Sequence, residues 1–91
     1  MRNYSLNECL YICMRNGDWW TYWDLQSVIK DNTGKLYGEP TISAGIRNFR
    51  KTEYREKFGL PMTGEVIYMK SRKPNKGYKF KLITEKINVN I

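Results

Sequence analysis

The feature that most constrains the fold of this chain is the strict alternation of apolar and basic residues in Tyr78-Lys79-Phe80-Lys81-Leu82. Successive side chains of a strand point to opposite faces, so this segment predicts a strand with one apolar and one basic face. Residues 65–71 are also rich in β-branched and aromatic residues, and the turn-rich segment 72–77 joins the two. We therefore expect a C-terminal β-hairpin, which excludes an all-helical fold.

Helices are predicted before the hairpin. Ser5-Leu6-Asn7-Glu8 has the spacing of a capping box and should begin a first helix, which Asn16-Gly17 would end. A short strand is expected at Asp18-Trp19-Trp20. Thr21 then caps a second helix that runs to about Asp31.

A third helix is expected from Pro40 or Thr41 to about Glu53, with residues 54–58 undecided until Gly59-Leu60-Pro61 breaks it. Within it, Ile42, Ile46 and Phe49 would form one buried stripe and leave the basic residues exposed.

Three tryptophans, Trp19, Trp20 and Trp23, lie where the first two predicted helices are joined. They could form a stacking platform for bases. We expect them in the core instead, because a domain this small has few other bulky side chains to fill its centre.

The chain of 91 residues is long enough for one domain, which we assign to residues 1–84, followed by a tail at 85–91. The tail alternates in polarity and could add an edge strand, form a homodimer contact or fray. The net charge of +7 is uneven: residues 1–40 hold four basic and five acidic residues, whereas residues 41–91 hold twelve basic and four acidic ones. A polyanion such as nucleic acid is the natural partner of the second half.

Several function classes are excluded. Histidine is absent, the glycines form no phosphate-binding pattern, and Cys9 and Cys13 alone make a poor zinc site. We expect buried, reduced cysteines, no enzyme, no metal and no cofactor. No apolar run could span a bilayer and no secretory signal is evident, so we expect a cytoplasmic protein without a membrane partner.

The order helix, short strand, helix, helix, strand, basic loop, strand resembles a winged helix-turn-helix domain, and the sequence is similar to that family over about Leu6 to Leu82. It is closest to the small winged-helix regulators of phage and prophage genomes, in which a segment like Thr33-Gly34-Lys35-Leu36-Tyr37 precedes a recognition helix resembling residues 41–51. Gly77-Tyr78-Lys79-Phe80-Lys81-Leu82 is similar to the family's return strand. The resemblance implies an α+β fold of three helices, a short strand after the first helix and a C-terminal hairpin wing.

The family often has basic residues where this chain has Ala44-Gly45. A glycine inside a helix costs about 1 kcal/mol relative to alanine. Either the backbone approaches DNA or another helix closely at this point, or this helix does not contact bases.

The predicted function is double-stranded DNA binding, as a transcriptional regulator or a phage accessory or replication factor. The third helix would read bases in the major groove, and the basic wing would contact phosphates. The candidate nucleic-acid-binding residues are Thr41, Ser43, Arg47, Asn48, Arg50, Lys51, Lys70, Arg72, Lys73, Lys76 and Lys79.

Two alternatives stay open. A winged-helix interaction module, acting as an adaptor or inhibitor, would use the same basic face to bind an acidic protein. RNA binding would require exposed aromatic side chains, which Trp19 and Trp20 supply only if they face solvent.

Overall fold

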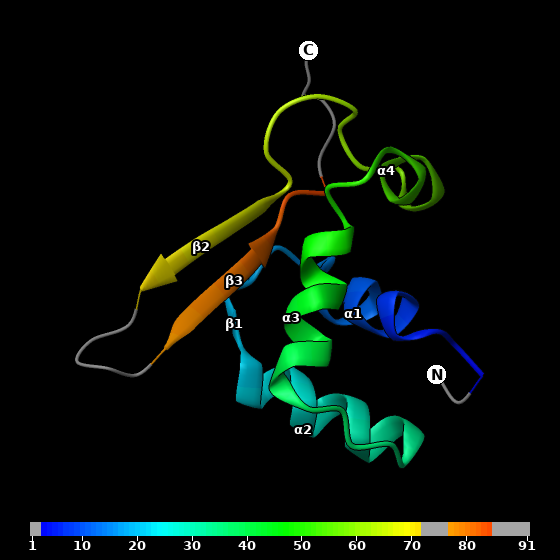
Figure 1. The fold of residues 1–91 in the computed structure, drawn as a ribbon, viewed down its shortest axis with the longest axis vertical. Coiled ribbons are helices and arrows are strands. Elements are labelled where there is room, and N and C mark those ends of the chain that lie inside the picture. Colours follow the sequence, from blue (N-terminus) through cyan, green and yellow to red (C-terminus); the bar gives the residue numbers. More distant parts are fainter. Residues whose placement is uncertain (1–2, 72–76, 85–91) are drawn as a thin grey trace.

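The computed structural model describes residues 3–71 and 77–84, and these form an α+β fold with four helices and one three-stranded antiparallel sheet. The predicted tail 85–91 and the wing residues Arg72, Lys73 and Lys76 lie outside the described residues. In Figure 1, α3 runs between the β2–β3 hairpin and α1, and the hairpin projects away from the helices.

The first two helices begin where the sequence predicts. The helix α1, Leu6–Met14, starts at a complete capping box made by Ser5 and Glu8. After the two-residue strand β1, Trp20–Thr21, a second capping box between Thr21 and Asp24 starts α2, Tyr22–Thr33. Gly34 ends α2 in the left-handed conformation that glycine favours, with φ of 80°.

The helix α3, Glu39–Asn48, is shorter than expected, and a separate helix α4, Thr52–Phe58, follows it. The prediction of one helix to about Glu53, and so of three helices in all, was wrong. The backbone turns at 49–51, where Lys51 is extended, with φ of −71° and ψ of 144°.

Aromatic packing explains this break. The rings of Phe49 and Phe58 are 5.4 Å apart between centroids, and Phe58 also stacks on Tyr11 of α1 at 5.0 Å. In a continuous helix, nine residues would separate the two phenylalanines by about 13 Å along the axis. The turn therefore lets both rings reach the same cluster, and this long-range gain is not visible in the local pattern.

The hairpin is confirmed: β2, Ile67–Ser71, pairs with β3, Tyr78–Leu82, and β1 pairs with the other edge of β3. In this register, Ile67, Met69, Phe80 and Leu82 share the face turned toward the helices, and Ile67 and Leu82 are buried there. The core is otherwise mostly aliphatic, with Leu10, Leu25, Ile29, Ile42 and Ile46 among its fully or almost fully buried side chains.

The expectation that all three tryptophans fill the core was wrong. Trp20 is partly buried against the core, but Trp19 and Trp23 are 37% and 65% exposed. Trp19 and Trp20 are neighbours at a sheet edge, so their side chains point to opposite faces, and only Trp20 meets the helices. The buried cysteines are confirmed: Cys9 and Cys13 are free thiols, 1% and 6% exposed.

Candidate nucleic-acid interface

The exposed side of α3 is created by the way its other side packs. Ile42, Gly45 and Ile46 are buried, whereas Thr41 and Arg47 are exposed. At 100° per residue, Arg47 lies about 200° around the helix from Gly45, so it is on the side turned away from α1. The packing of α1 against α3 therefore decides which residues of α3 are accessible.

Gly45 makes close packing of α3 on α1 possible. A Cβ atom at this position would lie 2.8 Å from Leu10 Cδ1 and 3.3 Å from Leu6 Cδ2. The buried side chain of Asn7 donates from Nδ2 to the Gly45 carbonyl oxygen at 2.8 Å. Of the alternatives that the sequence left open, the structure favours the close approach of a neighbouring helix.

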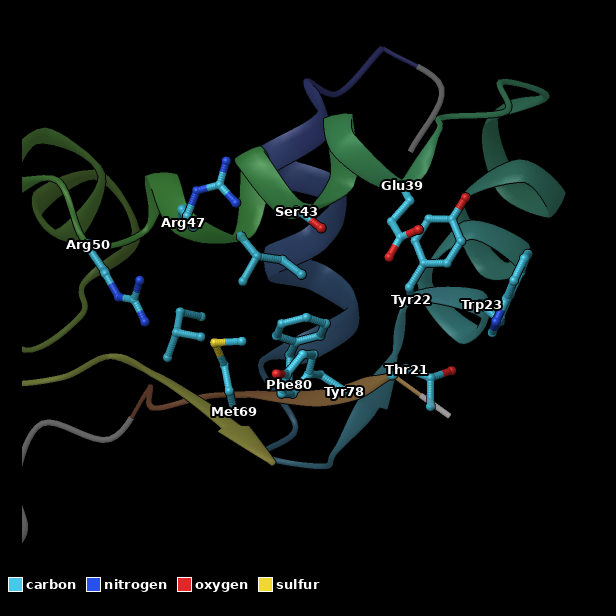
Figure 2. A pocket seen from close by; sticks show the side chains of 13 residues that line it. Thr21, Tyr22, Trp23, Glu39, Ser43, Arg47, Arg50, Met69, Tyr78 and Phe80 are labelled. Atoms are coloured by element: carbon cyan, nitrogen blue, oxygen red, sulfur yellow. The ribbon is translucent and has the colours of Figure 1, made fainter. Parts of the chain in front are cut away.

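A groove of about 350 Å³ separates α3 from the hairpin. Figure 2 shows Ser43 and Glu39 directed into it from α3, Phe80 and Met69 rising from the sheet opposite, and Tyr22 closing one end. Three of the side chains that line it are large, apolar and at least half exposed: Trp23, Met69 and Tyr78. The groove is thus mainly aromatic and apolar, with charged groups from α3 and the segment after it.

The two arginines of the groove differ in their partners. Arg50 lies just after α3, and its Nε donates to Glu65 Oε1 at 2.8 Å, which links this segment to the residues before β2. This hydrogen bond holds the pKa of the Glu65 carboxyl below its usual value, and the backbone N–H groups of Ile67 and Val66 add to the effect. Arg47, by contrast, forms no ion pair with any described residue.

The loop before α3 is held by one side chain of α2. Gln26 Nε2 donates to the Tyr37 carbonyl oxygen at 2.9 Å and to the Tyr22 hydroxyl at 2.7 Å. These two hydrogen bonds connect the loop before α3 with Tyr22, at the aromatic end of the groove. The position of the groove therefore depends on α2 as well as on the sheet.

The structure brings only some of the predicted site residues together. Ser43, Arg47 and Arg50 share the groove. Thr41 and Asn48 lie on the other flank of α3, and Lys51 is exposed at the start of α4.

Lys70 and Lys79 pair with each other across β2 and β3, and they alternate with Met69, Tyr78 and Phe80, which line the groove. Their side chains therefore leave the sheet on its opposite face. Although they were predicted as nucleic-acid-binding residues together with those of α3, these two lysines do not share the α3 surface, because the same alternation that predicted the strand also turns them away from α3.

Several groove residues were missed as site candidates, among them Tyr22, Trp23, Met69 and Tyr78. Trp23 was expected in the core, whereas the structure leaves Trp23, Met69 and Tyr78 at least half exposed. No family model, curated protein or solved structure matches this chain.

Among 3–71 and 77–84, no three cysteine or carboxylate side chains gather as they would around a metal ion. Within the same ranges, no helix has both the length and the apolar character needed to cross a membrane.

Proposed function

We propose that this chain binds double-stranded DNA as a winged helix-turn-helix protein, with α3 as the recognition helix and the β2–β3 hairpin as the wing. The order of elements and the sheet order β1-β3-β2 are compatible with that fold, to which α4 is an addition. The proposal includes a role as a transcriptional regulator or as a phage accessory or replication factor.

The observation that carries the proposal is Arg47. It is exposed on a helix whose opposite side is locked against α1, and no described residue neutralises it. An arginine in this setting can pair with the O6 and N7 atoms of guanine in the major groove. Thr41, on the other flank of α3, and Lys51, just beyond its end, would contact the phosphates beside it.

The wing contributes charge rather than sequence reading. The sequence between β2 and β3 contains Arg72, Lys73 and Lys76 and no acidic residue. If about five phosphates are neutralised in all, the logarithm of the affinity should fall against the logarithm of the salt concentration with a slope of about −4 to −5.

The test is a selection of bound sequences from a random duplex library, followed by titration of the selected duplex at two salt concentrations. We expect Arg47→Ala to weaken binding by about 1–3 kcal/mol and to relax preference at one base pair. Arg15→Ala is the matched control, because Arg15 is an exposed arginine at the end of α1. Replacing Arg72, Lys73 and Lys76 by glutamine should weaken all duplexes alike. Selection of no preferred sequence, or an unchanged preference in Arg47→Ala, would refute the proposal.

The apolar groove favours one second candidate, an adaptor or inhibitor that binds an acidic protein segment. The exposed faces of Trp23, Met69 and Tyr78 would bury apolar side chains, and Arg47 would pair with a carboxylate. This candidate predicts weak duplex binding without sequence preference, so the same selection separates the two.

A further inference from the structure

The face of the sheet turned away from α3 has its own chemistry. It displays Trp19, Tyr68, Lys70, Lys79 and Lys81, which we call the outer face. The pairs Tyr68–Lys81 and Lys70–Lys79 lie directly opposite one another across β2 and β3, and Trp19 precedes β1 on the other side of β3. Three lysines and two aromatic residues therefore gather on one side of three short strands.

The lysines of the outer face surround an aromatic ring rather than a carboxylate. The Nζ atoms of Lys70 and Lys81 each lie 5.7 Å from the centroid of the Trp19 ring. The ion pairs found among the described residues are Arg50–Glu65 and Lys57–Glu8, and neither lies on this face. Lysines directly opposite each other on a sheet repel, so this arrangement lowers the stability of the free protein.

Both aromatic side chains are accessible. Trp19, which adjoins β1, is 37% exposed, and Tyr68, which belongs to β2, is 49% exposed. Both side chains are accessible although the other face of the sheet packs against the helices. Exposed aromatic rings among lysines are what single-strand binders use, because bases stack on the rings and the ammonium groups meet the phosphates. A duplex cannot use the rings in this way, since its bases are already stacked on each other.

We propose that the outer face binds a single-stranded nucleic acid, with bases stacked on Trp19 and Tyr68 and the phosphates held by Lys70, Lys79 and Lys81. The charge of the face fits a polyanion, and its rings distinguish a single strand from a duplex. This site is separate from the α3 surface and does not depend on the proposed duplex binding.

The experiment measures fluorescence anisotropy of labelled 15-nucleotide single strands, one of DNA and one of RNA, at two salt concentrations. We expect Trp19→Ala and Tyr68→Ala each to weaken binding about tenfold. The double variant Lys70→Gln/Lys81→Gln should flatten the salt slope by about 1.4, because each phosphate contact on a single strand contributes about 0.7. A difference between the two strands would identify DNA or RNA as the preferred ligand.

Matched controls lie elsewhere on the protein. Tyr4→Ala removes an aromatic side chain that is 47% exposed, about as much as Tyr68, but precedes α1, and Lys30→Gln removes an exposed lysine near the end of α2. Both should leave single-strand affinity within about twofold of the wild-type value. Thermal unfolding checks that each variant is folded. If Trp19→Ala does not fold, Tyr68→Ala tests the site by itself.

Several results would overturn the proposal. One is that Tyr4→Ala weakens binding as much as Tyr68→Ala does. Another is that neither single strand binds while vesicles containing phosphatidylserine, or an acidic peptide, bind in a manner that depends on Trp19. Loss of single-strand binding in Arg47→Ala with retention in Tyr68→Ala would also assign the activity to the α3 surface instead.

Discussion

The close contact between α1 and α3 gives a prediction with competing terms, because Gly45→Ala should both help and harm the protein. Alanine favours a helix over glycine by about 1 kcal/mol. Against this gain, the new Cβ would lie 2.8 Å from Leu10 Cδ1, and Leu10 is completely buried. The leucine methyl group can move only by displacing other core atoms, and such overpacking costs about 1–3 kcal/mol.

A second loss follows from the same displacement. If α3 moves away from α1, the hydrogen bond from Asn7 to the Gly45 carbonyl oxygen lengthens or breaks. A buried amide without its partner costs about 1–3 kcal/mol. The two losses together outweigh the gain, so we expect Gly45→Ala to lower the free energy of unfolding by about 1–5 kcal/mol. For a domain of this size each 1 kcal/mol lowers the melting temperature by about 4–8 °C.

Thermal and urea unfolding followed by circular dichroism measure this change. The control is Ala44→Gly, at a half-buried position beside Gly45, which should cost about the 1 kcal/mol of helix propensity alone. In the double variant Leu10→Ala/Gly45→Ala the clash is gone, so its cost should be smaller than the sum of the two single changes by about 1 kcal/mol or more. A stabilised Gly45→Ala protein, or strict additivity, would show that the helices do not meet in this way.

Three further predictions concern charge, thiols and a buried amide. Glu65→Gln should remove the carboxylate charge beside Arg50 and steepen the salt slope of duplex binding by about 0.9; an unchanged slope would mean that Arg50 does not reach DNA. It should also remove the stability that the wild type loses as the pH falls from about 4.5 through the lowered pKa of Glu65. Burial raises the pKa of Cys13 from 9.0 to about 11, so this thiol ionises at a lower pH in the unfolded chain than in the folded protein. The free energy of unfolding should therefore fall by about 1 kcal/mol between pH 8 and pH 10, and urea titrations of Cys13→Ala should not show this loss. Asn7→Ala should lower the free energy of unfolding by about 1–3 kcal/mol and Asn32→Ala by less than about 0.5 kcal/mol. Each amide donates to a backbone carbonyl oxygen at 2.8 Å, but only Asn7 is buried, so equal losses measured by urea unfolding would contradict this prediction.

Local patterns predicted most of the helices and strands. Both capping boxes act within four residues, so Ser5 and Thr21 mark their helix starts without reference to the rest of the molecule. The alternation in 78–82 likewise determined a strand and its two faces. These features depend on neighbours in sequence, which is why the sequence is sufficient to find them.

Features that depend on distant residues were missed or left open. The end of α3 is set by the meeting of Phe49, Phe58 and Tyr11, and the role of Gly45 is set by Leu10 and Asn7. The same dependence on distant residues explains why the site was predicted only in part. A count of positive charges from Lys70 to Lys81 does not say which lysines face α3. Which face of the hairpin is turned toward α3 depends on how the hairpin packs against the helices.

If α3 reads DNA as we propose, its early end at Asn48 limits how much sequence one copy of the chain can recognise. Ten residues of helix extend for about 15 Å, which is the length of roughly four base pairs. Four base pairs recur by chance every few hundred positions in any genome. A regulator with so short a reading element needs adjacent half-sites occupied by several copies, or a companion protein that brings it to the correct locus.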